Sequence, residues 1–117
     1  VFCGPSIVAR SGDAEGFGMV FAEAQAMGLP VVSFATGGIP EAVIHGETGL
    51  LSPAKDTAQL SRDLLRLLQD GDLRRRFARA GQAHVAKNFD LQKNTPLLEA
   101  LYDDVVATYR EQPLAKD

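Results

Sequence analysis

Short apolar runs punctuate the first half of the chain and predict strands. Residues 30–35 read Pro-Val-Val-Ser-Phe-Ala, a β-branched run bounded by chain breakers. Such a run is typical of a strand that is buried on both faces of a sheet. Residues 1–3 and 50–51 are shorter apolar runs, and we expect them to belong to two further strands.

Helix-like segments separate these runs. Residues 17–27 are rich in Ala, Met and Glu and predict a helix that Gly28 terminates. If this helix begins at residue 17, Glu23 lies about two turns into it. Pro40 suits the first turn of a short helix through residue 44.

The second half is helical throughout. Asp56 and Gln59 have the spacing of a helix-capping pair, and the helix that follows them is expected to end at Gly71. Asp72 is expected to cap the next helix. Residues 98–109 carry an apolar stripe typical of a last helix. Strands that alternate with helices predict an α/β fold with a Rossmann-like parallel sheet of about three strands.

Composition and charge exclude several classes of protein. The chain has 117 residues, of which 45% are hydrophobic and 23% are charged, which is too apolar for a disordered tail and too charged for a membrane span. A net charge of −3 argues against nucleic acid as a partner. The single cysteine excludes an internal disulfide. Residues 1–50 hold five acidic residues and one basic residue, Arg10, so the acidic charge is concentrated there.

The segment from Glu15 to Glu23 carries the most specific chemistry. Gly16 and Gly18 allow the backbone to approach a ligand closely at the start of a helix. The first-turn amides of a helix have no intrahelical partner and favour an anion such as a diphosphate. A carboxylate accepts two hydroxyl hydrogen bonds at once, which suits the vicinal diol of a ribose.

A plainer interpretation of the same two acids stays open. An acid before a helix and an acid within it are common, and Glu15 would also complement the helix dipole. The long irregular loop over residues 4–16 favours a functional site, because loops of this length in compact domains are usually functional or disordered.

The order of motifs in this region resembles that of retaining glycosyltransferases with the GT-B fold, in particular glycosyltransferase family 4, the group 1 glycosyltransferases. Residues 15–23 match the family's E-x7-E signature. The likeness continues through residues 23–32, 37–41 and 46–51, and it covers residues 4–53 closely. Several ordered motifs are a more specific signal than a lone glycine-rich loop.

This resemblance implies a role for individual residues. The parent enzyme would transfer a sugar from a nucleotide-diphosphate sugar to an acceptor hydroxyl with retention, in polysaccharide or glycolipid synthesis. Glu15 would act in the catalytic region beside the donor hexose, and Glu23 would bind the donor ribose. No metal or other cofactor is expected. The other donor-binding positions would be Gly16, Phe17, Gly18, Met19, Val20 and Gly38.

The resemblance also implies that residues 1–117 form a single partial domain. The chain begins at Val1 on a strand, and we expect it to be the second half of a GT-B C-terminal domain, a fragment that is inactive alone. A sugar or lipid-linked acceptor would bind a missing N-terminal domain. The open sheet edge would favour self-association. The enzyme would be cytoplasmic. The arginines of residues 74–79 would form a solvated helix face or, as an alternative, would attach the enzyme peripherally to the inner face of the membrane.

Two rival functions remain open from the sequence. One is another GT-B enzyme that uses sugar nucleotides, either an epimerase or a glycogen-synthase-like enzyme. The other is a non-catalytic α/β module that binds a nucleotide or a phosphate. Transfer of a sugar to a defined acceptor would distinguish a glycosyltransferase from the first rival. Titration with nucleoside diphosphates would measure the binding that the second rival requires.

Overall fold

The computed structural model describes residues 1–13, 16 and 18–111. Two compact units divide the chain, residues 1–87 and residues 88–117, and each is described by itself. The elements in chain order are β1 (Phe2–Cys3), α1 (Met19–Ala26), β2 (Val31–Phe34), α2 (Ile39–Ala42), β3 (Gly49–Ser52), α3 (Thr57–Gln69), α4 (Gly71–Asn88) and α5 (Leu91–Glu111).

The first unit is built on a three-stranded parallel sheet of order β1-β2-β3, which confirms the predicted fold class. Val31 of β2 pairs with Gly49 of β3. A Cβ atom at Gly49 would lie 2.4 Å from the carbonyl oxygen of Val31, so only glycine allows the two strands to approach this closely. All four residues of β2 are buried, as the sequence pattern predicted for a central strand.

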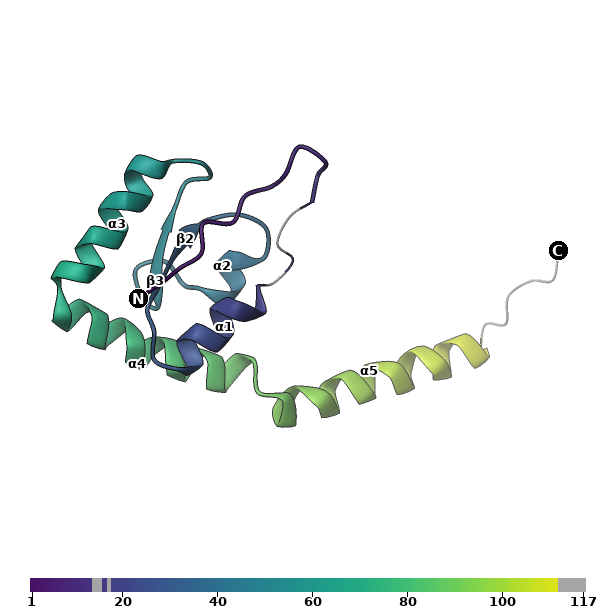
Figure 1. Ribbon diagram of the computed structural model, residues 1–117. Coiled ribbons are helices and arrows are strands. Elements are labelled where there is room, and N and C mark those ends of the chain that lie inside the picture. Colours follow the sequence, from purple (N-terminus) through teal and green to yellow (C-terminus); the bar gives the residue numbers. More distant parts are fainter. Residues whose placement is uncertain (14–15, 17, 112–117) are drawn as a thin grey trace. The chain divides into compact units, whose positions relative to one another are not determined.

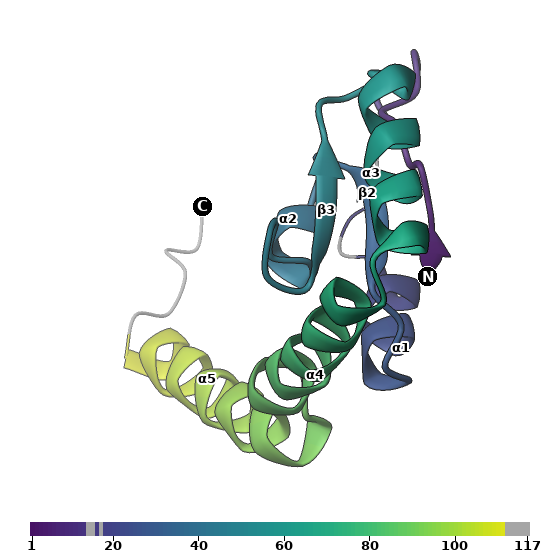
Figure 2. The ribbon, with the colours of Figure 1, turned by 90° about the vertical axis from the view of Figure 1, so that its left-hand side faces the viewer.

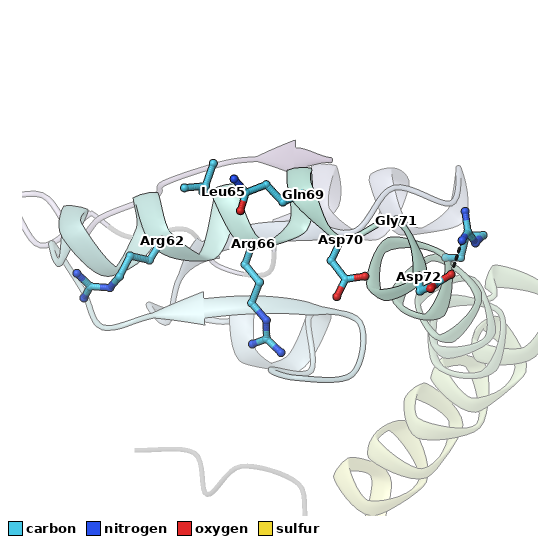
Figure 3. Close-up of a pocket in the computed structure, with 8 residues that line it drawn as sticks. Arg62, Leu65, Arg66, Gln69, Asp70, Gly71 and Asp72 are labelled. Atoms are coloured by element: carbon cyan, nitrogen blue, oxygen red, sulfur yellow. Dashed lines mark hydrogen bonds and ion pairs between the residues drawn. The ribbon is translucent and has the colours of Figure 1, made fainter.

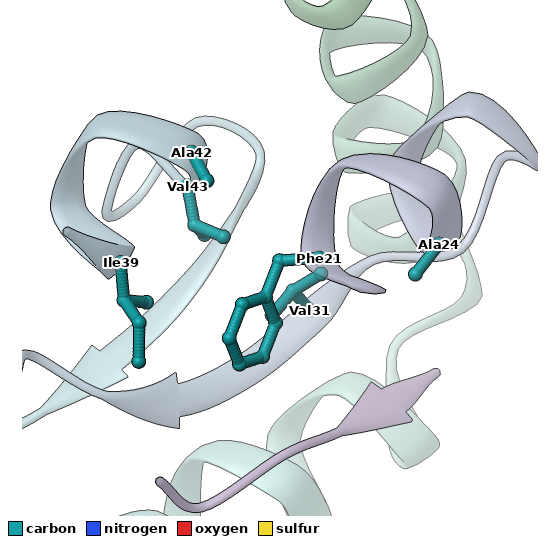
Figure 4. Close-up of a cluster of buried hydrophobic side chains, with 6 residues drawn as sticks. All are labelled: Phe21, Ala24, Val31, Ile39, Ala42 and Val43. Carbon is teal, nitrogen blue, oxygen red and sulfur yellow. The ribbon is translucent and has the colours of Figure 1, made fainter. Parts of the chain in front are cut away.

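Successive residues of β2 point to opposite faces of the sheet and into separate clusters. Val31 packs in a cluster with α1 and α2, whereas Val32 packs with α3 and α4. Figure 1 shows these layers, with α3 on one side of the strands and α1 and α2 on the other, and Figure 2 views the strands from the α3 side. The cluster beneath α1 and α2, drawn in Figure 4, consists of Phe21, Ala24, Val31, Ile39, Ala42 and Val43.

Helix α1 begins at Met19 and not at residue 17 as the sequence predicted. Gly18 has a φ of 75° and a ψ of 67°, a left-handed conformation that cannot continue a right-handed helix. The predicted end is confirmed, because Gly28 also has a φ of 75° and the amide of Leu29 donates to the carbonyl of Ala24 over 2.9 Å.

The junction between α3 and α4 corrects the predicted cap. The Asp56 carboxylate does accept from the amide of Gln59, as expected. At the next boundary, however, Asp70 accepts from the amide of Leu73 over 2.9 Å, and Gly71 is the first residue of α4. Asp72 instead forms an ion pair with Arg75.

Arg74 is the arginine of the 74–79 run that points back into the fold. Its guanidinium donates to the carbonyl oxygens of Leu67 and Leu68 over 2.7 and 2.6 Å. These are among the last carbonyls of α3, which have no partner within their own helix. Arg74 therefore caps α3 and does not belong to a uniformly solvated face.

The second unit contains α5, a helix of 21 residues with Pro96 inside it. Its large apolar side chains are exposed, including Leu101 at 58% and Tyr102 at 63% of their full accessible area. No helix in the described part of the chain is long and apolar enough to cross a membrane.

Candidate functional site

The candidate site lies at the carboxyl edge of the sheet, where the segments after β1 and β2 leave the strands. In parallel α/β sheets this edge is the usual place for ligands. The segment after β1 leads to Gly18 and α1, and the segment after β2 leads through Gly37 and Gly38 to α2. The two helices cover the same face of the sheet (Figure 1), so their N-terminal ends belong to one side of the domain.

Two hydroxyl groups of β2 and its following turn hold the loop after β1. Ser33 donates through Oγ to the carbonyl of Gly4 over 2.7 Å, and Thr36 donates through Oγ1 to the carbonyl of Ser6 over 3.0 Å. Further along, the amide of Ala9 donates to the carbonyl of Asp13 over 2.7 Å. The base of the long loop is therefore tied to the turn that precedes Gly38. The sequence pattern carried no signal for these ties.

The N-terminal end of α1 has no side-chain cap, and Gly18 itself is buried. Gly18 is the N-cap, and no side chain caps the helix there. Met19 and Val20 follow with 65% and 47% of their full accessible area exposed. The first-turn amides of any helix lack intrahelical acceptors, and the helix dipole is positive at this end. The end of α1 therefore has the helix start on which the predicted anion site depends, and the binding of an anion there stays a prediction.

Glu23 lies closer to this end than the sequence predicted. Because α1 begins at Met19, Glu23 is the fifth residue of the helix and lies one turn from its start, not two. Residues four apart share a helix face, so Glu23 and Met19 lie on the same exposed side. Among the described residues, no hydrogen bond or ion pair involves the Glu23 carboxylate. It is thus available to a ligand.

Gly38 is the N-cap of α2, with a φ of −83°, and Gly37 before it has a φ of 54°. The amide of Ile39 donates to the carbonyl of Thr36 over 3.1 Å and closes the turn. The two glycines therefore form a tight turn before α2. Of the other predicted residues, Gly16 is exposed, and Glu15 and Phe17 lie outside the described residues.

Both histidines have structural contacts. His45 accepts through Nδ1 from the amide of Leu51 over 2.9 Å, and Nε2 of His84 lies 3.2 Å from the carbonyl oxygen of Glu41. Within the described ranges, no group of three or more His, Cys, Asp or Glu residues is arranged to hold a metal ion.

A hollow lies elsewhere on the first unit, and both of its acidic residues have partners. It is an open groove of about 630 Å³ along α3 and the start of α4 (Figure 3). Its acidic residues are engaged: Asp70 caps Leu73, and Asp72 pairs with Arg75. No residue of α1 or of the turn before α2 lines the groove. Its lining residues are Arg62, Leu65, Arg66, Gln69, Asp70, Gly71, Asp72 and Arg75.

Solved structures share this architecture. Sucrose-phosphate synthase from Thermosynechococcus elongatus superimposes with a TM-score of 0.74 at 35% identity, covering 79% of this chain and 23% of that one. The Anabaena protein HepE, solved in complex with UDP and glucose, gives a TM-score of 0.68 at 31% identity, covering 74% of this chain and 24% of that one. The parallel unit is thus of the type found in the C-terminal domain of GT-B enzymes.

The family follows from the sequence comparison. The family described as "Glycosyl transferases group 1" matches residues 1–84. A D-inositol 3-phosphate glycosyltransferase from Corynebacterium efficiens is 39% identical over 104 residues, which are 89% of this chain and 24% of that protein. The chain belongs to the group 1 glycosyltransferases, as its motifs indicated. It spans about a quarter of the length of the curated relatives it matches.

Proposed function

We propose that this chain is part of the donor-binding domain of a retaining glycosyltransferase that uses a nucleotide-diphosphate sugar. The observation that carries the proposal lies on one face of α1: the helix start has no side-chain cap, and the Glu23 carboxylate one turn later has no bonded partner among the described residues. The first element suits a diphosphate and the second suits a ribose diol. The solved relative with UDP and glucose supports this class of ligand.

The donor would lie along α1. Backbone amides at Gly18, Met19 and Val20 would receive the distal phosphate, and the Glu23 carboxylate would accept hydrogen bonds from the ribose hydroxyls. Gly38, at the start of α2, would offer its backbone to the donor from the other side of the site. Gly16 and Phe17 complete the donor-binding set proposed from the sequence. Glu15 would contact the hexose hydroxyls in the catalytic region.

In the reaction, the acceptor oxygen forms a bond to the anomeric carbon and the bond from that carbon to the diphosphate breaks. The diphosphate leaves with the electron pair, and the acceptor proton passes to a phosphate oxygen on the same face of the sugar. The protein would contribute position and charge stabilisation. Arg10, the only basic residue before residue 51, is exposed in the loop after β1. The further cations that a departing diphosphate needs would come from the rest of the enzyme.

The test uses the full-length protein that contains these residues. It is incubated with UDP-glucose, GDP-glucose or ADP-glucose, and release of nucleoside diphosphate is measured with and without sugar and lipid acceptors. We expect one donor to be cleaved, and NMR of the product to show an unchanged anomeric configuration. Isomerised donor without transfer would favour an epimerase. Tight binding of a sugar nucleotide, with neither hydrolysis nor transfer of its sugar to an acceptor, would favour a non-catalytic binding module.

A further inference from the structure

Gln25 is a buried polar residue that the proposed function does not use. It lies on α1, two positions after Glu23, with 1% of its full accessible area exposed. Its Nε2 donates to the carbonyl of Phe21, one turn earlier, over 3.1 Å. The same Nε2 donates to the carbonyl of Ala42, the last residue of α2, over 2.7 Å. One side-chain amide thus joins the two helices.

These two helices form opposite sides of the proposed donor site. Their other shared contacts are apolar, as Figure 4 shows for Phe21 against Ile39 and Val43. Apolar contacts are non-directional. In the described part of the chain, the bond from Gln25 to Ala42 is the one hydrogen bond between α1 and α2. It therefore gives the two helices one direct, directional contact.

A third helix holds this amide in place. A Cβ atom at Gly81 of α4 would lie 3.2 Å from Cγ and 3.4 Å from Oε1 of Gln25. Gly81 is itself buried, so α4 packs directly on the side chain. Residue 81 has room for no larger side chain unless Gln25 moves.

The other end of the amide is unsatisfied. Among the described residues, Oε1 of Gln25 has no hydrogen-bond partner although it is buried. A buried acceptor without a partner destabilises a fold, and an apolar side chain of similar size would fill the space without this cost. The directional bond to Ala42 is what glutamine supplies and an apolar side chain does not.

We propose that Gln25 is a positioning residue, which fixes the spacing between α1 and α2 so that Glu23 and the turn at Gly38 engage one donor together. This inference rests on the proposed function. It predicts that changing Gln25 alters donor recognition in a folded protein, although no atom of Gln25 touches the donor.

The first test is Gln25→Met in the full-length protein. If wild type cleaves UDP-glucose, the rate of UDP-glucose hydrolysis is the readout. Methionine keeps the length and removes the bond and the unsatisfied oxygen together, so the thermal midpoint should change little. We expect the donor KM to rise about fivefold, which corresponds to about 1 kcal/mol, with kcat within about twofold of wild type. Gln25→Glu should not restore the wild-type KM, since its carboxylate lacks the amide donor.

The second test acts on Gln25 from α4. Gly81→Ala should raise the donor KM in the same direction, because the added methyl group pushes Gln25. Gly71→Ala is the matched control on the same helix: its Cβ would lie 3.5 Å from the flexible end of Arg74 and would not approach Gln25. In a Gln25→Ala background, Gly81→Ala should no longer change KM, because the two positions act through one contact.

The outcomes separate this inference from the proposed function. If wild type cleaves no sugar nucleotide, the proposed function fails. If wild type gives a measurable KM for the donor, and Gln25→Met and Gly81→Ala both have this same KM, the positioning role is refuted. A change in thermal midpoint without a change in KM, or equal additive effects of Gly81→Ala in both backgrounds, would also overturn it in favour of a purely structural role.

Discussion

Glu23 offers the sharpest test of the ligand assignment, because its functional and structural contributions are separable. The side chain is exposed on α1 and has no bonded partner in the described part of the chain, so Glu23→Ala should change the free energy of unfolding by no more than about 0.5 kcal/mol. Its proposed role is to accept two hydroxyl hydrogen bonds from the donor ribose. Loss of function without loss of stability is therefore expected.

The size of the effect follows from the exposure of the site. Hydrogen bonds to a charged group contribute about 1.5–3 kcal/mol each when sheltered, and solvent at this exposed position reduces the pair to about 2 kcal/mol in total. This predicts a Kd for UDP raised about 30-fold in Glu23→Ala. Glu23→Gln keeps one acceptor oxygen and should show a smaller increase. Isothermal titration of the full-length protein measures both values.

A ligand-side change provides the control. We expect 2′-deoxy-UDP to bind wild type about fivefold more weakly than UDP, since one of the two hydroxyl bonds, about 1 kcal/mol, is lost. Glu23→Ala should bind the two nucleotides equally, because the group that distinguishes them is gone. If Glu23→Ala still discriminates between UDP and 2′-deoxy-UDP as wild type does, another residue binds the ribose and the assignment is wrong.

Three further changes have distinct expected outcomes. Glu15→Ala should lower kcat for sugar transfer by at least tenfold with a smaller effect on UDP affinity, and unchanged turnover would remove it from the catalytic region. Gly49→Ala should destabilise the fold by about 3 kcal/mol in urea unfolding, because its Cβ would lie 2.4 Å from the Val31 carbonyl oxygen, whereas Gly71→Ala should not. In reducing buffer, the 117-residue chain should associate through the open edge of β1 in sedimentation experiments, and Cys3→Pro should prevent this because it removes the amide facing that edge.

The predictable part of the fold came from residues whose local chemistry leaves few choices. The apolar run of β2 is buried on both faces, and Gly28 ends α1, as the sequence indicated. The start of α1 was misplaced by two residues, because Gly18 supports either a helical or a left-handed conformation and the sequence does not distinguish them. The cap of α4 was misplaced similarly, since Asp70 and Asp72 are both acceptable caps.

The parts of the site that the sequence missed all depend on contacts between distant residues. Ser33, Thr36 and Gln25 lie at positions where small or apolar residues would suit the strand or helix pattern equally well. Their partners are backbone carbonyls 29, 30 and 17 residues away in the chain. A backbone carbonyl is present at every residue and leaves no signature in a sequence. Motifs therefore predict which groups would meet a ligand, whereas the long-range contacts that support those motifs are visible only in the folded chain.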